Sequence, residues 1–313
     1  MEVFAVRNPG PMTTVQDLGR RGFLDRGVPL SGALDPLACR AANLLVGNPE
    51  EAAVLEITLM GPTLEILSAA DVALTGADMG MTINGNPVPG WRAARVSPGD
   101  ILRIPRAVEG CRAYLAVTGG IDVPLMMGSR STFVRAKIGG FRGRGLAKGD
   151  ILHRGERTLA AHPRTLPDSW IPRYGREILL RAMPGPQDDS FRKGIGVFFS
   201  ASYEVTTEAD RMGYRLRGPA VECDEGIPKS IVTEPTTPGN VQIPADGQPI
   251  ILLVEQTSGG YAKIATVISP DLSRVAQAVP GNTVHFERVA LEEAHRLYRE
   301  HQELLSRIRE VLR

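Results

Sequence analysis

The chain has 313 residues, with 36 Lys or Arg and 35 Asp or Glu, so its formal net charge is +1. This balance argues against a dedicated nucleic-acid-binding protein, and a hydrophobic content of 42% argues against wholesale disorder. No apolar run approaches the ~20 residues that span a bilayer, and the N-terminus lacks a signal-peptide pattern. We therefore expect a cytoplasmic protein with no membrane segment.

Cysteine and histidine usage gives no indication of a metal site. The three cysteines lie far apart, and the five histidines show no metal-ligand spacing. The chain contains 34 Gly and 24 Pro, more than average usage, without low complexity. We therefore expect many turns and no bound metal.

Short strands between Gly/Pro turns are predicted for most of the chain. The candidates in the first half are residues 72–74, 81–83, 101–104 and 114–117. The pair Asn84-Gly85 predicts a hairpin turn, because both residue types tolerate positive φ. In the second half, the apolar run 250–254 is long enough for a buried strand.

Two helices are predicted. Asp35 caps the first and Pro36 begins it, its apolar residues share one face, and it ends near Gly47. The second covers about residues 290–313, with one apolar stripe and charges elsewhere. This C-terminal helix either packs on its own domain or binds a partner.

The weakly periodic segment 153–176 is typical of a connection between domains. We place an N-terminal β-rich domain with its connector at 1–170, a second β-rich domain at 171–289 and the C-terminal helix at 290–313. Three short motifs recur in the same order, at 7–11 and 181–186, at 59–65 and 216–222, and at Thr75 with 98–100 and Thr257 with 280–282. This recurrence favours two related β-rich domains over a mixed β fold without internal symmetry.

A polar, glycine-rich loop leads into the first predicted helix, over residues 14–22 and 27–35. A helix N-terminus presents unpaired amides and attracts anions. Gln16, Arg20 and Ser31 are placed to hold a polar small molecule beside it. The alternative is that Gln16, Asp17 and Arg20 satisfy one another and the loop backbone.

Further glycine-rich stretches carry arginines, at 118–122, 128–132 and 139–144. Arg130 and Arg144 are each suited to grip a carboxylate or carbonyl oxygen. Tight turns and an interdomain ion pair are the alternative. The pattern G-x-x-x-x-G-K-[ST] does not occur, which excludes a nucleotide P-loop.

The second half of the chain has its own polar clusters. Residues 210–216 include Arg211 and Arg215, residues 239–244 include Gln242, and the strand at 250–254 runs into the polar sequence 255–261. Binding groups often lie at such strand ends, although Asp210 and Arg211 are equally typical of a surface pair of little energetic value. No Ser-His-Asp arrangement or G-x-S-x-G occurs, so catalysis would polarise an amide or carbonyl through Arg, Gln, Thr and backbone amides.

Six of these blocks, in their order along the chain, resemble the biotin-dependent carboxyltransferase family, also called the allophanate hydrolase subunit 2 family. The similarity covers about residues 3–289, and the blocks are residues 16–22, 31–35, 118–120, 128–132, 210–213 and 256–261. The family usually has Asp near the position of Glu255 and a Thr near Ser258. The longer acid in this chain alters the reach of its carboxylate.

The resemblance implies a cyclophilin-like β-barrel fold and a homologous partner, the B subunit. With an A subunit, the bacterial complexes cleave 5-oxo-L-proline to L-glutamate using ATP, so the implied role is the C subunit of a 5-oxoprolinase. One alternative is the carboxyltransferase component of a biotin-dependent carboxylase of urea or a similar amide. The other is a non-catalytic regulator that binds a kinase-inhibitor homologue of the B subunit.

The enzyme interpretation assigns roles to residues of the blocks. Asp17, Arg130 and Glu255 are the catalytic candidates, with either acid as a base. The candidates for binding a small amide substrate are Gln16, Arg20, Ser31, Arg144, Arg211, Arg215, Gln242, Gln256, Thr257 and Tyr261. No Met-Lys-Met biotinylation site and no nucleotide signature occurs. We therefore expect ATP to bind at the level of the complex, and any biotin to be on a separate carrier.

Overall fold

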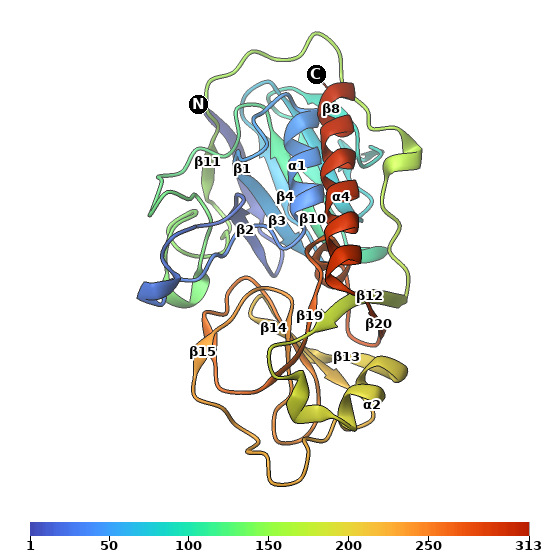
Figure 1. The fold of residues 1–313 in the computed structure, drawn as a ribbon. Coiled ribbons are helices and arrows are strands. Elements are labelled where there is room, and N and C mark those ends of the chain that lie inside the picture. The colour runs from blue at the N-terminus through green and yellow to red at the C-terminus, as the bar shows by residue number, and fades with distance from the viewer. Residues whose placement is uncertain (313) are drawn as a thin grey trace. The chain divides into compact units, whose positions relative to one another are not determined.

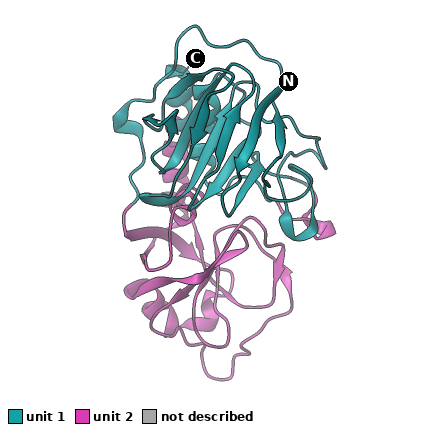
Figure 2. Ribbon diagram, turned by 180° about the vertical axis from the view of Figure 1, so that it is seen from behind, with its two compact units in different colours: residues 1–22, 31–174, 305–313 teal, residues 23–30, 175–304 magenta. Residues whose placement is uncertain are grey.

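The computed structural model describes residues 1–312 as two compact units (Figure 2). Unit 1 comprises residues 1–22, 31–174 and the chain from Leu305 onward, and unit 2 comprises residues 23–30 and 175–304. Both units are mainly β, as predicted, with few helices (Figure 1). Arg313, the last residue of the predicted C-terminal helix, lies outside the described residues.

Unit 1 contains two antiparallel sheets. The first has the order β11-β1-β4-β9-β6-β7 and consists of β1 (Glu2–Asn8), β4 (Thr63–Ile66), β6 (Thr82–Ile83), β7 (Asn86–Pro87), β9 (Ile101–Arg103) and β11 (Ile151–His153). The second has the order β2-β3-β10-β5-β8 and consists of β2 (Thr13–Gln16), β3 (Val54–Thr58), β5 (Ala70–Asp78), β8 (Ala93–Val96) and β10 (Glu109–Val117). All four strands predicted in the first half are present.

The alternation of residues along β3 and β10 separates the two faces of the second sheet. Leu55 and Ile57 of β3 lie in the hydrophobic core that both sheets share, as does Leu115 of β10. Successive side chains of a strand point to opposite faces. Glu56 and Tyr114 therefore lie on the other face, although both are buried.

Helix α1 (Pro36–Leu45) confirms the first predicted helix. The Asp35 carboxylate accepts a hydrogen bond from the amide of Ala38 at 3.1 Å, which satisfies one of the free amides of the first turn. The helix packs on β5 and β10. Unit 1 also has two short 3-10 helices, η2 (Val134–Ala136) and η3 (Asp168–Trp170).

The predicted hairpin is also confirmed. Strands β6 and β7 pair across Asn84 and Gly85, whose φ angles are 52° and 82°. Both central residues of the turn therefore have left-handed backbone, which matches the right-handed twist of the flanking strands.

Unit 2 is built on a closed seven-stranded barrel of order β12-β19-β16-β17-β14-β13-β20. Its strands are β12 (Glu177–Pro184), β13 (Ser202–Ala209), β14 (Gly213–Arg217), β16 (Asn240–Gln242), β17 (Ile250–Leu252), β19 (Lys263–Val267) and β20 (Thr283–Arg288). The predicted strand at 250–254 is therefore present but shorter. A small separate sheet pairs β15 (Glu234–Pro235) with β18 (Ser258–Gly259).

Short helices and aromatic side chains complete unit 2. The helical segments are η1 (Leu24–Arg26), η4 (Asp188–Phe191), α2 (Gly194–Ser200), η5 (Ser269–Asp271) and α3 (Leu272–Ala276). Phe198 of α2 stacks on Phe286 of β20, with 4.3 Å between ring centroids. This contact attaches α2 to the barrel.

Helix α4 (Leu291–Val311) confirms the predicted C-terminal helix. Its first part belongs to unit 2, where Ala294 and Leu297 pack against Ile268 and Val289. Its last turns belong to unit 1, where Arg309 forms an ion pair with Glu50. The apolar stripe is therefore buried within the chain itself.

The recurring motifs do not correspond to a repeated sheet order. The first pair of motifs does end the first long strand of each unit, β1 and β12. However, the strands of unit 1 form open sheets, and the closed barrel found in the described residues belongs to unit 2. The structure thus supports a mainly β chain with one barrel.

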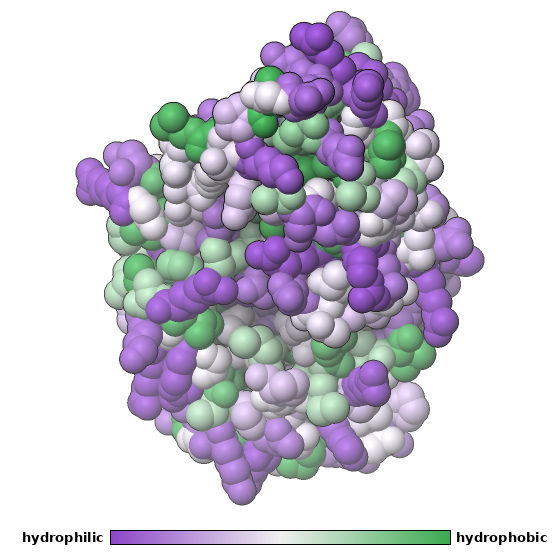
Figure 3. Space-filling view, turned by 90° about the horizontal axis from the view of Figure 1, so that it is seen from below, coloured by the Kyte–Doolittle hydropathy of each residue, from purple (hydrophilic) through white to green (hydrophobic). Residues whose placement is uncertain are grey.

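No helix among residues 1–312 is both long enough and apolar enough to cross a membrane. The face drawn in Figure 3 carries hydrophilic residues interspersed with small hydrophobic areas.

Candidate functional site

A row of polar residues crosses the second sheet of unit 1. Thr14 of β2 lies opposite Glu56 of β3, Glu56 lies opposite Tyr114 of β10, and Tyr114 lies opposite Thr75 of β5. The Glu56 carboxylate accepts hydrogen bonds from the Tyr114 hydroxyl at 2.9 Å and from the amide of Leu34 at 3.0 Å. Burial, together with the charges of Glu56 and Asp35, raises the pKa of Tyr114 well above its usual value, so this hydroxyl remains protonated.

Glu56 and Tyr114 are not among the residues predicted from the sequence motifs. A signal was available, because each stands between apolar residues of a buried strand, Glu56 between Leu55 and Ile57. A charged side chain on a buried strand requires a partner. The partners of Glu56 are the Tyr114 hydroxyl and the amide of Leu34, which belongs to the predicted loop at 27–35.

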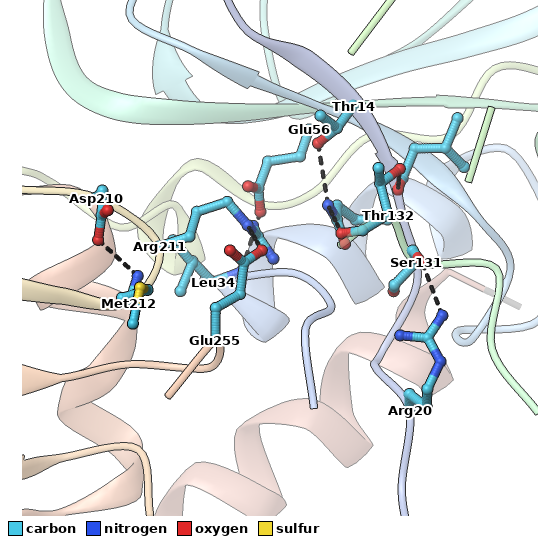
Figure 4. A network of polar contacts seen from close by, with 12 residues as sticks. Thr14, Arg20, Leu34, Glu56, Ser131, Thr132, Asp210, Arg211, Met212 and Glu255 are labelled. Atoms are coloured by element: carbon cyan, nitrogen blue, oxygen red, sulfur yellow. Dashed lines mark hydrogen bonds and ion pairs between the residues drawn. The ribbon is translucent and has the colours of Figure 1, made fainter. Parts of the chain in front are cut away.

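Gln16 and Arg20 both donate to main-chain carbonyls within residues 126–132. Figure 4 shows Arg20 directed toward Ser131. The Gln16 amide donates to the carbonyl of Thr132 at 3.1 Å. Arg20 donates from Nε to the carbonyl of Met126 at 3.0 Å and from Nη2 to that of Ser131 at 2.9 Å. Burial lowers the pKa of Arg20, while the charge of Asp17 acts in the opposite direction.

Asp17 is surrounded by hydrogen-bond donors. Its carboxylate accepts from the hydroxyls of Ser129 at 2.7 Å and Ser131 at 2.5 Å, and from the amides of Gly19 at 2.8 Å and Arg130 at 2.6 Å. Four neutral donors hold this carboxylate in one orientation. The sequence alternative had Gln16, Asp17 and Arg20 satisfying one another and the loop backbone. The contacts of Asp17 to the amides of Gly19 and Arg130 agree with its backbone part.

Arg130 is a partly buried candidate beside an open cavity. Its Nε donates to the carbonyl of Val123 at 2.9 Å. It lines an open cavity of about 340 Å³ together with residues 122–125. No carboxylate within residues 1–312 lies close enough to form an ion pair with Arg130, so its guanidinium is available to an anion.

Ser31 lies beside the same loop in strained backbone. Its φ is 52°, a left-handed value that is uncommon for residues other than glycine. The neighbouring Gly32 approaches Gly19 so closely that a Cβ atom on Gly32 would lie 2.7 Å from the Gly19 Cα. This close approach places Ser31 next to the segment that carries Asp17 and Arg20.

Arg144 forms a bidentate ion pair with Asp150, at 2.7 and 2.8 Å. The hydrogen bonds from Arg144 hold the pKa of Asp150 below its usual range. Both residues belong to unit 1, so the pair fastens the turn before β11. The structure thus places Arg144 in an ion pair within one unit, where the sequence alternative had an interdomain one.

In unit 2, Glu255 forms a buried ion pair with Arg211, with 2.6 Å between Nε and Oε1 (Figure 4). Their side chains are 6% and 11% exposed. The main chain reinforces the pair, because the amide of Glu255 donates to the carbonyl of Arg211 at 3.1 Å. The loop after β17 and the loop before β14 are therefore joined twice.

The remaining candidates in unit 2 make local contacts. The buried Gln242 donates to the carbonyl of Tyr261 at 3.1 Å, and Gln256 donates to the carbonyl of Ser258 at 2.6 Å. The carbonyl of Thr257 accepts from the amide of Thr236. Arg215 pairs at the surface with Glu208 at 3.0 Å.

Lys263, which sequence analysis missed, lies opposite Gln242 in the barrel and is buried. Its ammonium pairs with Glu234 at 2.5 Å and donates to the carbonyl of Pro235 at 3.1 Å. The hydrogen bonds from Lys263 and Gln187 lower the pKa of Glu234. These contacts fasten β15 to the barrel.

The sequence matches the family described as carboxyltransferase domain, subdomain A and B, over residues 26–288. The chain belongs to this carboxyltransferase family. It is 39% identical to the C subunit of 5-oxoprolinase from Escherichia coli over 306 residues, covering 96% of this chain and 95% of the relative. It is 38% identical to the C subunit of 5-oxoprolinase from Haemophilus influenzae over 301 residues, covering the same shares of the two chains.

The carboxyltransferase fold is also found in a solved structure. The K. lactis urea amidolyase matches 98% of this chain with a TM-score of 0.92 and 32% identity. This chain spans only 20% of that much longer protein. The fold of this chain is therefore shared by one region of that larger enzyme.

The carboxyltransferase chain has a second cavity in unit 1 that sequence analysis did not anticipate. It has a volume of about 400 Å³ and lies between the end of β5, residues 88–91 and residues 171–174. The buried Trp91 lines it, as does Tyr174, whose amide donates to the Glu109 carboxylate at 2.6 Å. Its lining is specified by residues from four separate parts of the chain, so no local motif indicated it.

No group of three or more His, Cys, Asp or Glu side chains with metal-binding geometry is found in the part of the chain that the structure describes.

Proposed function

We propose that this chain is the C subunit of an ATP-dependent 5-oxoprolinase that, with A and B subunits, opens 5-oxo-L-proline to L-glutamate. One observation carries the proposal: 39% identity to the C subunit of 5-oxoprolinase from Escherichia coli over 96% of one chain and 95% of the other. The match therefore extends over nearly all of that C subunit. The cyclophilin-like class for the barrel of unit 2 and a cytoplasmic location belong to the same proposal.

In this proposal Arg130 binds the substrate carboxylate. The supporting geometry is its partly buried guanidinium beside an open cavity, with its backbone amide held by Asp17 at 2.6 Å. A fixed, planar fork suits a carboxylate. Asp17 acts through the segment that it holds, as a positioning residue.

Glu255 is the proposed acid–base group. It is 8% exposed, and its ion pair with Arg211 orients one carboxylate oxygen. ATP is expected to bind at the level of the complex, since the chain has no P-loop pattern. Gln242, Gln256, Thr257 and Tyr261, together with Arg211, Arg215 and Arg144, remain proposed substrate contacts that mutagenesis can test.

A second candidate function is the carboxyltransferase step of a biotin-dependent urea carboxylase. The supporting observation is the TM-score of 0.92 to the K. lactis urea amidolyase over 98% of this chain. This function requires biotin on a separate carrier protein.

The test is to co-express this chain with the A and B subunits and to follow glutamate and ADP release from 5-oxoproline and ATP. We expect release only when this chain is present, and loss of release in Arg130→Ala. Arg92→Ala is the matched control, because Arg92 forms an exposed ion pair with Asp168 away from the cavity. Equal release without this chain would exclude the proposal, and carboxylation of urea by the complex with a biotin carrier would establish the second function.

A further inference from the structure

Among the buried polar atoms of the described residues that lack a hydrogen-bond partner, three belong to the glycine-rich loop region of unit 1. The atoms are Gln16 Oε1, Arg20 Nη1 and Ser31 Oγ. The residues are 0%, 1% and 1% exposed. Buried polar atoms are almost always paired in folded proteins, so three unpaired atoms on neighbouring residues require an explanation.

The three residues are held close together by contacts between their segments. The amide of Ala33 donates to the carbonyl of Asp17 at 2.8 Å, which aligns the segment of Ser31 with the segment of Gln16 and Arg20. Arg20 and Gln16 also bind the consecutive carbonyls of Ser131 and Thr132. These carbonyls fix the orientation of the Gln16 amide, because Thr132 must receive the nitrogen.

The unpaired atoms form a complementary set. Arg20 Nη1 carries only donors, the Ser31 hydroxyl is able to donate, and Gln16 Oε1 is an acceptor. A carbonyl oxygen accepts two hydrogen bonds, and an adjacent N–H donates one. An amide whose C=O and N–H share one edge therefore satisfies all three residues at once.

We propose that Gln16, Arg20 and Ser31 bind one edge of a lactam or primary amide, with its C=O toward Arg20 and Ser31 and its N–H toward Gln16. This inference rests on the proposed function and assigns the recognition of the amide to unit 1. A lactam and a primary amide present both groups on one edge. A trans peptide bond presents them on opposite edges, so the set selects against peptides.

Burial of the three atoms makes the site selective and requires it to open. Because the three residues are shielded from bulk solvent, a ligand that fails to match one of these atoms leaves that atom unpaired. Access to the three atoms therefore requires a conformational change in the segments that cover them.

The first test uses Ser31→Gly and Ser31→Ala in the complex with the A and B subunits. Both remove the hydroxyl, but Gly relaxes the φ of 52° whereas Ala keeps the strain. We expect the KM for 5-oxoproline to rise about tenfold or more in both variants, while Tm rises in the first and stays level or falls in the second. Asn84→Gly is the control for KM, because Asn84 has the same φ of 52° in an exposed hairpin; its Tm also reflects loss of the side-chain hydrogen bonds to Asp100 and Ile101.

An unchanged KM in Ser31→Gly would overturn the inference. A KM that rises only in the variant with the lower Tm would also overturn it. Equal KM increases in both variants, with Tm shifted in opposite directions, support direct contact with substrate.

The second test measures the choice between 5-oxoproline and its lactone analogue, 5-oxotetrahydrofuran-2-carboxylate, which lacks the N–H. We expect the wild-type complex to bind the lactam at least about tenfold more tightly. Gln16→Met removes the acceptor while preserving length, and should abolish this preference. A preference that survives in Gln16→Met overturns the role of Gln16.

Calorimetry with urea and 2-pyrrolidinone separates this inference from the proposed function. If the complex does not cleave 5-oxoproline, binding of either amide that is lost in Ser31→Gly still supports the site. If neither amide binds to the wild-type complex, the inference is wrong. If 5-oxoproline is cleaved independently of this chain, the proposed function is wrong.

Discussion

Asp17 in unit 1 and Glu255 in unit 2 are both buried carboxylates at predicted sites, but their partners differ in charge. Asp17 accepts from two hydroxyls and two main-chain amides, whereas Glu255 faces the guanidinium of Arg211. The neutral donors to Asp17 come from Gly19 and from residues 129–131, so they hold these two segments together. The guanidinium of Arg211 instead balances the negative charge of Glu255. The two acids are therefore expected to respond differently to substitution.

The largest effect is expected for Asp17→Asn. The variant replaces one acceptor oxygen by an NH2 group that faces donors, so several buried donors lose their partner. We expect a loss of about 3 kcal/mol or more in the free energy of unfolding, measured by urea denaturation, together with loss of turnover. Glu51→Gln is the control, because Glu51 is an exposed acid of unit 1 that does not line the cavity of Arg130. Near-normal stability in Asp17→Asn would show that Asp17 does not hold the loop.

A smaller effect on stability is expected for Glu255→Gln. The amide retains a hydrogen bond to Arg211 but loses the charge, which we expect to cost about 1–2 kcal/mol. Turnover should fall far more than stability if Glu255 is the acid–base group. Glu255→Asp keeps the charge with a shorter reach, so partial activity in this variant distinguishes charge from geometry. Full activity in Glu255→Gln would remove the acid–base role.

The ion pair of Arg144 with Asp150 allows a pH test. Because the folded-state pKa of Asp150 lies below its unfolded value, the pair stabilises the fold fully above about pH 4. This contribution is lost as the pH falls through the folded-state pKa. The Arg144 side chain is 36% exposed, so solvent screening limits the expected loss in Arg144→Met to about 1 kcal/mol at pH 7.

Urea denaturation of the wild type and Arg144→Met between pH 7 and pH 2 measures that difference. It should shrink toward low pH. A difference that does not depend on pH would mean that the packing of Arg144 matters rather than its charge, and a raised KM at neutral pH would make Arg144 a substrate contact.

The smallest effect is expected for Arg215→Met. The side chains of Arg215 and Glu208 are 50% and 73% exposed, so their ion pair contributes little. We expect a change in stability within about 0.5 kcal/mol, measured as a shift in the urea midpoint. A rise in KM for 5-oxoproline without a change in stability would support the predicted substrate contact.

Local sequence signals determined the elements that local chemistry specifies. Asp35 and Pro36 predicted the start of α1, Asn84 and Gly85 predicted the hairpin, and the apolar stripe after residue 290 predicted α4. Each depends on residues only a few positions apart. The order of six short blocks also indicated the carboxyltransferase family, which the match over residues 26–288 confirms.

The pairing of distant strands decided the rest. Thr14, Glu56, Tyr114 and Thr75 form one row only because β2, β3, β10 and β5 pair in a particular register. Register between strands depends on contacts across the whole sheet and shifts every side chain to the other face if it slips by one residue. For the same reason, the sequence indicated that Asp17, Arg130 and Glu255 are candidates, whereas only the tertiary structure showed which partners each of them has.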